Sequence, residues 1–528
     1  MLTPPFKPKL PEIAEHEQTP LVRSLLQIIG QQQEQIQRLE DEIRRLQGGP
    51  PRPPLKPNTL EPVVRVEASA ADGATPRRRG PHRAKTAELT IHATETVPVA
   101  DVPAGAEFKG YRRFVVQDLE IRPQNTCYLL EQWRFPTGEY VTAPVPATAV
   151  RGGHYGPQLV SYVLHQYYHA HVTPPLLLAQ LHDWGIEISA GQLNHLLTEG
   201  HDAFHEEKAA LKAAGLAMSS YIQADDTGAR HQGQNGYCTY IGNERFAWFA
   251  STESKSRVNF LELLQTERRY EVNAAVLASM AERGLAGWHR ERLAARPVVL
   301  TDPEAWAAHL RRNLIDSPRA VALATEGALI GGLAAQGFNL DIGLVSDDAG
   351  QFDLFVHGLC WIHAERPLSH RVPLNETDRR AIAWVRQPVW FLYRDLKAYR
   401  QAPDPAAKAR ITADFAALCA TDTTCEPLNQ VLQGFQRNQA ELLRVLERPD
   451  LPIHNNRSET DLRDMVKKRN ISAGTRSEDG RRCRDTFASL KKTCRKQGVS
   501  FWEYLKDRVA GLNVIPSLAE LIRRPATA

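Results

Sequence analysis

The chain has 528 residues, of which 42% are hydrophobic and 24% are charged, a composition typical of a globular protein with several structural units. No apolar run approaches the roughly 20 residues that a membrane-spanning helix needs, and the N-terminus lacks the apolar segment of a secretory signal. Seven widely spaced cysteines, with no Cys-x-x-Cys pair, argue against a disulfide scaffold and a zinc finger. We therefore expect reduced thiols, a cytoplasmic location and no membrane partner.

The net charge of +4 conceals an uneven distribution of charge. Residues 451–510 contain 15 Lys and Arg against 8 Asp and Glu, a local charge of +7, so the rest of the chain carries −3. A basic C-terminal block suits a polyanionic partner such as DNA. A solvated basic surface without a partner is an equally good interpretation of the charge alone.

The N-terminal part predicts a coiled coil followed by a linker. After a tail at 1–20, residues 21–47 carry hydrophobic side chains at most heptad a and d positions, with β-branched residues at a, leucine at most d positions and Gln32 at one d position. That pattern favours a parallel dimer, and a helix packed on its own domain is the alternative. Residues 48–104 are basic and rich in proline, which predicts a flexible linker.

Two small units are expected next. Residues 105–150 contain short β-prone runs separated by turn residues, which predicts a small antiparallel β unit. Residues 151–205 switch to helical spacing, with helices expected at 158–171, 174–184 and 189–199 and an N-cap at Ser189. Three short helices of this kind resemble a helix-turn-helix, whose last helix would offer Gln192 and Asn194 to DNA. Generic three-helix packing explains the pattern nearly as well.

From residue 218 onward, strands and helices alternate, and three acidic residues occupy comparable places. Two β-prone runs end in carboxylates, at Asp225-Asp226-Thr227 and at Asp347-Asp348. Residues 376–450 have a helical pattern that predicts an insertion. Residues 451–528 then open with an amphipathic helix that carries Glu459 in its first turn, with Asn455 or Asn456 as the N-cap.

Three carboxylates that converge from two strands and a helix predict a two-metal site. Carboxylate oxygens are the ligands that Mg²⁺ prefers, and two ions about 3.5–4 Å apart promote phosphoryl transfer. Arg463 and Lys467 follow Glu459 at i+4 and i+8, so they share its helix face and are expected to hold DNA phosphates. An ordinary salt bridge within the helix is the alternative for this face.

These segments resemble the DDE transposases of the insertion-sequence-66 family over roughly residues 150–510. The clearest match runs from His454-Asn455-Asn456 through Glu459 to Arg463, followed by Lys468-Arg469-Asn470. Three further segments are similar, at Asp225-Asp226-Thr227, at Val345 to Phe352, and at Cys360-Trp-Ile-His363. The chain departs from the family at His454, where aspartate is usual, and in lacking N-terminal cysteine pairs.

The resemblance implies a multidomain α/β protein with an RNase-H-like core, a mixed five-stranded sheet flanked by helices. The first part of this core would span 218–375 and the last part 451–528, around the helical insertion. The resemblance makes Asp225, Asp347 and Glu459 the catalytic acids and ligands of two Mg²⁺ or Mn²⁺ ions. It assigns Arg463, Lys467, Lys468 and Arg469 to DNA. The side chains expected to support the acids are Asp226, Thr227, Asp348, Cys360, His363, His454, Asn455 and Asn456.

The function implied is transposition: metal-dependent cleavage of DNA at insertion-sequence ends and strand transfer into target DNA. The partners would be transposon and target DNA, a second copy bound through the coiled coil, and accessory proteins encoded by the element, with the protein at the bacterial nucleoid when bound. Three alternatives remain: an inactive or domesticated DNA-binding derivative, a nuclease that cuts without joining, and a scaffold built on the coiled coil.

Overall fold

A computed structural model describes residues 89–102, 104–146, 154–371, 373 and 375–525, and the chain divides into units at 1–118 and 119–528. The predicted coiled coil at 21–47 and most of the linker at 48–104 lie outside the described residues. The described residues of the first unit, 89–102 and 104–118, contain neither helix nor strand.

The second unit begins with a hairpin of two short antiparallel strands, β1 (Gln132–Arg134) and β2 (Tyr140–Thr142). The turn between them passes through Gly138, whose φ of 92° suits glycine. All six strand residues are exposed. Within the described part of 105–150, the predicted β unit is therefore only this hairpin, because the strands are too short to bury an apolar face.

Four helices follow: α2 (Pro157–Tyr168), α3 (Pro174–Asp183), α4 (Ala190–Thr198) and α5 (Asp202–Ala217). The first three are the helices that the sequence predicts. Ser189 caps α4 as expected, and its hydroxyl accepts the Gln192 N–H while the Gln192 side chain accepts the Ser189 N–H, a reciprocal capping box. Leucines from α2, α3 and α4 form their common core.

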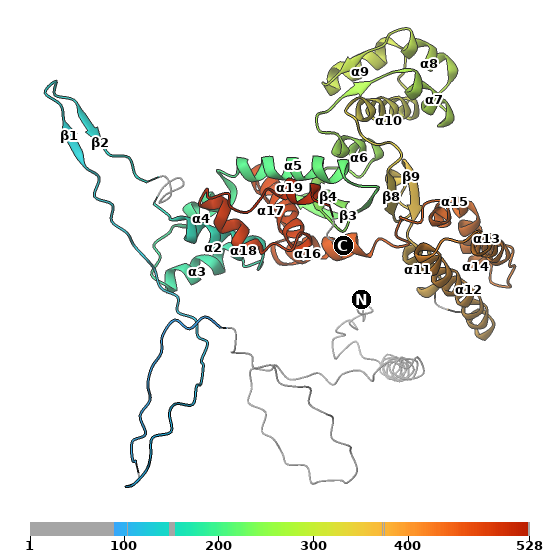
Figure 1. The fold of residues 1–528 in the computed structure, drawn as a ribbon. Helices are drawn as coiled ribbons and strands as arrows, with labels where there is room; N and C mark the ends of the chain where they lie inside the picture. The colour runs from blue at the N-terminus through green and yellow to red at the C-terminus, as the bar shows by residue number, and fades with distance from the viewer. Residues whose placement is uncertain (1–88, 103, 147–153, 372, 374, 526–528) are drawn as a thin grey trace, which may run out of the picture. The chain divides into compact units, whose positions relative to one another are not determined.

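A mixed sheet forms the centre of the unit, and its strands run in the order β5-β4-β3-β8-β9 (Figure 1). Strands β3, β8 and β9 are parallel to one another, and β4 is antiparallel to both β3 and β5. A sixth, two-residue strand pairs with the far end of β3. The strands are β3 (Tyr221–His231), β4 (Gln234–Gly242), β5 (Ala247–Thr252), β8 (Gly343–Ser346), β9 (Val356–Leu359) and β10 (Gly474–Thr475).

A segment between β5 and β8 folds into helices around a small second sheet. The helix α10 packs against β6 and α7, and two of its glycines, Gly331 and Gly332, lie directly against the backbone carbonyls of Glu271 and Arg269. The elements are α6 (Arg257–Leu264), β6 (Tyr270–Glu271), α7 (Ala274–Glu282), α8 (Gly287–Ala294), β7 (Val299–Leu300), α9 (Pro303–Arg312) and α10 (Pro318–Ala335).

The predicted helical insertion has a hydrophobic core of its own, built largely from leucines and phenylalanines together with Trp361. Between residues 376 and 450 the structure contains helices and no strand, as the sequence pattern predicts. A 3-10 turn, η2 (Gly350–Phe352), and helix α11 (Trp361–Ser369) lead into it. Its elements are α12 (Glu376–Gln401), α13 (Pro405–Cys419), α14 (Glu426–Arg437), α15 (Gln439–Leu442) and the 3-10 turn η3 (Arg444–Leu446).

The chain returns to the sheet with α16 (Asn456–Ser472), α17 (Glu478–Lys496), α18 (Phe501–Val509) and α19 (Leu518–Arg523). Helix α17 covers the outer edge of β5. The N–H groups of Ala247, Phe249 and Ser251 point away from β4 and donate to side chains of α17 at 3.1, 2.9 and 2.7 Å. The acceptors are Thr493, Ser489 and Asp485, four residues apart on one helix face.

No helix in the described part of the chain is both long and apolar enough to cross a membrane.

Candidate active site

The parallel pairing of β3 with β8 brings two of the predicted acids together. Gln223 on β3 is the register partner of Val345 on β8, and each acid lies two residues further along its own strand direction. Because side chains alternate between the two faces of a sheet, Asp225 and Asp347 lie on the same face as this pair. The β8 pairing ends here, so the acids lie where the two strands separate.

The structure corrects one detail of the prediction. Asp225 is not at the end of its strand, because β3 continues to His231, where the register with β4 ends at Gln234. It lies instead at the point where β3 loses its partner on the β8 side. Asp347 follows β8 directly, as expected.

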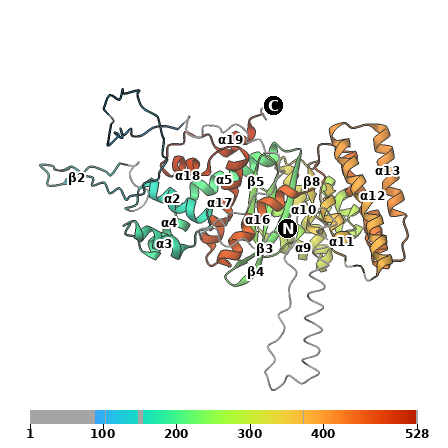
Figure 2. The same cartoon turned by 90° about the horizontal axis from the view of Figure 1, so that it is seen from below.

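Helix α16 lies on the face of the sheet that carries Asp225, and Figure 2 shows it beside β3. Its apolar residues Leu462 and Met465 pack on that face with Ala229 of β3. At the start of the helix, the Gln223 side-chain amide donates to the His454 carbonyl oxygen at 2.8 Å. Glu459, in the first turn, is thereby brought toward the two aspartates.

The electrostatics of Asp225 show that the three acids interact. The pKa of Asp225 is raised to about 7 by burial, which is the largest cause, together with the negative charges of Asp347 and, to a smaller extent, Asp226 and Glu459, against a hydrogen bond from the Asp226 N–H that lowers it. Repulsion of this kind is expected where carboxylates gather without a cation. The site therefore holds negative charge that a bound dication would neutralise.

Glu459 itself is engaged by two side chains of α11. Its Oε1 accepts a hydrogen bond from Arg366 Nη2 at 3.0 Å and lies 3.2 Å from His363 Nε2. Sequence reasoning did not identify Arg366 as part of the site, although it lies one helical turn after His363 and therefore on the same helix face. The three-residue spacing of His363 and Arg366 in the sequence indicates that both side chains can reach the same site.

Among the described residues, no three His, Cys, Asp or Glu side chains are arranged closely enough to hold a metal ion. The predicted triad of Asp225, Asp347 and Glu459 is thus adjacent but does not form a ready metal cage. The reason is visible in the contacts of Glu459, whose carboxylate is directed to Arg366 and His363. The donor chemistry nevertheless fits Mg²⁺ or Mn²⁺, because all three acids supply oxygen and Asp225 carries uncompensated repulsion.

The neighbouring acids have other partners. Asp226 points to the opposite face of β3, where its Oδ2 accepts a hydrogen bond from Gln351 at 2.7 Å. Asp348 accepts one from Asn438 at 3.0 Å. These contacts distinguish Asp225 and Asp347, which face α16, from the acids that follow them in the sequence.

The His-Asn-Asn segment and Cys360 join α11 to α16. The Asn455 N–H donates to the Cys360 sulfur at 3.4 Å, and both residues are buried. This contact joins the start of α11 to the start of α16 through Cys360. Asn455 occupies the N-cap of α16 without a side-chain cap bond, and both its side-chain polar atoms are buried without a hydrogen-bond partner, as are Gln223 Oε1 and the Nδ1 atoms of His363 and His454.

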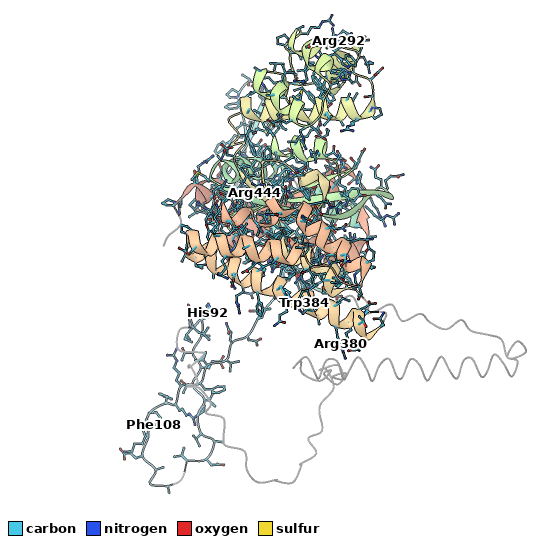
Figure 3. All side chains as sticks on the ribbon, turned by 90° about the vertical axis from the view of Figure 1, so that its right-hand side faces the viewer. His92, Phe108, Arg292, Arg380, Trp384 and Arg444 are labelled. Carbon is cyan, nitrogen blue, oxygen red and sulfur yellow. The ribbon has the colours of Figure 1, made fainter. Side chains whose placement is uncertain are left out.

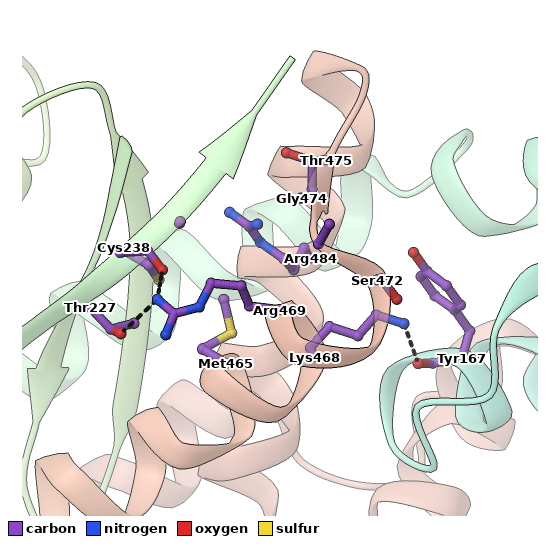
Figure 4. Close-up of a pocket in the computed structure, with 13 residues that line it drawn as sticks. Tyr167, Thr227, Cys238, Met465, Lys468, Arg469, Ser472, Gly474, Thr475 and Arg484 are labelled. Atoms are coloured by element: carbon purple, nitrogen blue, oxygen red, sulfur yellow. Dashed lines mark hydrogen bonds between the residues drawn. The ribbon is translucent and has the colours of Figure 1, made fainter. Parts of the chain in front are cut away.

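The residues predicted to bind DNA divide into two groups. Arg463 and Lys467 are exposed on α16. Lys468, by contrast, is buried with its ammonium 3.5 Å from the centre of the Tyr167 ring, and Arg469 donates to the Thr227 hydroxyl at 3.3 Å and to the Gly228 carbonyl (Figure 4). In this arrangement both side chains tie α16 to its neighbours, and their role as DNA contacts stays a prediction.

On α4, the two predicted DNA contacts also differ. The side-chain oxygen of Gln192 is engaged by the Ser189 N–H at 2.9 Å and by the Tyr155 hydroxyl at 3.0 Å, so it supports the fold. Asn194 is exposed. Gln192 is exposed as well, so both residues remain predicted DNA contacts.

Part of the basic C-terminal block is internal. Lys491 and Lys492 on α17 are each 7% exposed, and Lys491 lies 2.7 Å from Asp464 on α16. Lys492 lies 3.3 Å from Asp464, and Lys496 lies 2.9 Å from Asp461. Three of the block's 15 Lys and Arg side chains thus form an ion-pair network between α16 and α17, and the net charge of the segment overstates its exposed basic surface.

Comparison with known proteins agrees with this architecture. A family model described as "Transposase IS66 family" matches residues 345–482, which include Asp347 and Glu459. A curated relative, "Uncharacterized protein y4jO" of Sinorhizobium fredii (strain NBRC 101917 / NGR234), is 41% identical over 322 residues, which cover 59% of this chain and 99% of the relative. The chain belongs to the IS66 family of transposases.

Proposed function

We propose that the chain is a DNA transposase that cleaves DNA at insertion-sequence ends and joins the cut 3′ ends to target DNA. Asp225, Asp347 and Glu459 would hold two Mg²⁺ or Mn²⁺ ions. The observation that carries the proposal is the shared β3–β8 register, which places two aspartates on the sheet face covered by the helix of the third acid.

The sheet supports an RNase-H-like assignment for the core. Three strands that form an antiparallel meander, β3 to β5, are followed across the sheet by two strands parallel to β3. The acids lie on the first strand and directly after the fourth, which are neighbours in space. The five main strands form a mixed sheet, the kind of sheet that the resemblance implies.

When bound, such ions would activate a water molecule or a 3′-hydroxyl and stabilise the leaving oxygen. The chain's own residues would position the substrate. Arg463 and Lys467 are exposed on the face of α16 that carries Glu459, so they are suited to phosphates on either side of the cleaved bond. Arg366 balances the charge of Glu459 and would be free to contact a phosphate once that acid binds an ion.

The remaining parts of the proposal concern assembly. The exposed Asn194 and the helices of 151–205 would contact the transposon ends, and the coiled coil would pair two copies so that both ends are handled together. Accessory proteins encoded by the element are further expected partners. A cytoplasmic, nucleoid-associated location follows from the substrate.

The sharpest test compares adjacent aspartates. Asp347→Asn should reduce metal-dependent cleavage by more than the roughly 10- to 100-fold that changes around a metal site cost. Asp348→Asn, the matched control, should cleave nearly as well as the wild type, because Asp348 is bound to Asn438. The assays are nicking of a plasmid that carries the element's ends and transfer of a pre-cut 3′ end into target DNA.

A second candidate function is supported by the engagement of Glu459 with Arg366 and His363. A catalytically inactive DNA-binding derivative would keep this arrangement permanently. It would bind the element's ends equally well in Mn²⁺ and in EDTA, and neither wild type nor Asp348→Asn would cut. Cutting without transfer of the pre-cut end would instead indicate a nuclease.

A further inference from the structure

Helix α12 carries a row of aromatic and basic side chains along one face. Arg386, Trp390, Tyr393 and Lys397 are spaced at i, i+4, i+7 and i+11, which places them on a single stripe of an α-helix. The Trp390 and Tyr393 rings meet edge to face, with centroids 5.4 Å apart. The core of the insertion is formed by other residues of α12, including Val385, Val389, Leu392 and Leu396. Tyr393 is partly buried against that core, whereas Trp390 is exposed beside it.

One end of the stripe is tied to α11. Arg386 Nε donates to Glu365 Oε1 at 2.7 Å. The next residue of α11, Arg366, is the side chain that contacts Glu459. The stripe therefore begins beside the helix that closes the carboxylate site.

The other end of α12 is tied to the segment that leads into α16. Arg400 donates to the carbonyl oxygens of Pro449 and Asp450, both at 3.3 Å. Midway along the stripe, burial raises the pKa of Tyr393, and the nearby Cys360 at the start of α11 raises it further. The stripe thus runs along the border between the insertion and the two segments that supply His363 and Glu459.

The chemistry of the stripe is suited to nucleic acid. Trp390 remains 39% exposed and Lys397, about two helical turns further along the same face, is exposed, so an aromatic ring and a cation are both open to solvent on this face. Nucleobases stack on exposed aromatic rings, and cations beside those rings hold the backbone phosphates. Asp395 lies on the opposite side of α12, where it pairs with Arg410 of α13, and thus does not oppose a polyanion at the stripe.

We propose that Arg386, Trp390, Tyr393 and Lys397 form a stacking platform for a DNA base that has left the duplex beside the cleaved phosphodiester. Lys397, and Arg386 when Glu365 releases it, would face the backbone of the same strand. The inference rests on the proposed function for its substrate, DNA, and adds a role for the helical insertion. Extrusion of one base would also open the strand at the bond that the acids act on.

The same helix supplies a matched control. Trp384 and Phe391 are 59% and 46% exposed, at least as exposed as Trp390, and Figure 3 shows Trp384 on the outer edge of the insertion. They lie about 120° and 100° around the helix from Trp390, toward the side that faces α13. Arg394 packs on the Phe391 ring at 5.0 Å. This second patch is also aromatic and basic, but it is turned away from the carboxylate site.

The experiment compares two double variants of the full chain, Trp390→Ala/Tyr393→Ala and Trp384→Ala/Phe391→Ala, by fluorescence anisotropy in EDTA. The probes are fluorescein-labelled oligo(dT), a blunt duplex and a forked duplex with a dT arm. We expect the first variant to bind oligo(dT) and the fork on the order of 10-fold more weakly, with little change for the blunt duplex. The second variant should bind all three probes as the wild type does.

Three results for Trp390→Ala/Tyr393→Ala would overturn the inference. Its binding of oligo(dT) could be unchanged, or its binding of the blunt duplex could fall as much as its binding of oligo(dT). Its molar mass by light scattering could also be lower than that of the wild type, which would make the stripe an interface between copies. Trp390→Phe/Tyr393→Phe keeps both rings and should restore binding, which excludes misfolding as the cause of a loss. Because the assay needs no cleavage, a negative result for the stacking platform would not change the interpretation of the Asp347→Asn experiment. A chain that never cuts can still show the selective loss on oligo(dT).

Discussion

Replacing Asp464 by asparagine tests the ion-pair network that holds α16, the helix of Glu459, against α17. The substitution keeps the shape of the side chain and removes its charge. Lys491 would then lose the carboxylate that lies 2.7 Å away, and Lys492 would keep only the more distant Asp461, at 3.6 Å. Removing one partner of a buried ion pair costs about 3–5 kcal/mol, because the remaining charge is buried without compensation.

Two features of the structure place Asp464→Asn at the lower end of that range. The Asp464 side chain is 23% exposed, so water screens part of the interaction. Lys491 also keeps its hydrogen bond to the Tyr168 carbonyl at 3.0 Å. We therefore expect a loss of about 3 kcal/mol in the free energy of unfolding, measured by urea unfolding followed by circular dichroism at pH 7.

The pH dependence of this loss has a definite sign. Burial acts to raise the pKa of Asp464, but His171, whose Nε2 lies 3.8 Å from Asp464 Oδ1, and the charges of Lys491 and Lys492 lower it well below its usual value. Its contribution to stability is thus complete above the unfolded pKa of about 3.9 and is lost as the pH falls through the folded value. The difference between wild type and variant should be constant from about pH 5 to 7 and shrink below about pH 4.

Asp316→Asn removes the same charge from an exposed position and serves as the control, with an expected change within about 0.5 kcal/mol. An Asp464→Asn variant that unfolds at the wild-type urea concentration would refute the reasoning, as would a difference that grows toward low pH.

Two further substitutions test burial and close packing. Burial and the charge of Lys491 lower the pKa of Lys468 to about 8, so its ammonium destabilises the folded chain at pH 7. Lys468→Met removes this cost but also loses the contact of the ammonium with the Tyr167 ring, so the free energy of unfolding should rise by a net of about 1 kcal/mol. The Lys468 ammonium loses its proton at a lower pH in the folded chain than in the unfolded chain. The stability gain of Lys468→Met should therefore shrink as the pH rises from about 8 to about 10. A variant that is less stable than the wild type in urea unfolding would contradict this prediction. Gly332→Ala would place a methyl group against the Arg269 carbonyl and should lower the free energy of unfolding by about 2 kcal/mol or more, measured by thermal unfolding. Gly191→Ala on α4, where the added methyl group meets only an ordinary contact, should be neutral or stabilising in the same measurement.

The main elements of the core could be predicted from local sequence. Helical periodicity identified the helices of 151–205 and the helical insertion, because each has a clear apolar pattern of its own. The pairing of Asp225 with Asp347 was foreseeable too, since both follow β-prone runs. What the pattern did not show was the length of β3, because its second half is determined by pairing with β4 and not by its own apolar content.

The contacts of the charged residues were the least predictable part. Whether a lysine such as Lys492 faces solvent or a buried aspartate depends on which helix packs against it, and the pair Lys492 and Asp464 is separated by nearly thirty residues. The same holds for Lys468, whose aromatic partner Tyr167 comes from the other end of the unit. A charge count along the chain measures composition, and the surface charge is determined only after the helices have docked.

The covered edge of β5 has a consequence for how copies of the chain associate. An open outer strand can recruit a strand from another molecule and extend one sheet across both, a route that leads to ordered partners and also to aggregates. Here the outward N–H groups of Ala247, Phe249 and Ser251 are already occupied by α17 within the same chain. Self-association at this edge would require α17 to detach first, so the β5 side of the core is protected against strand exchange between copies.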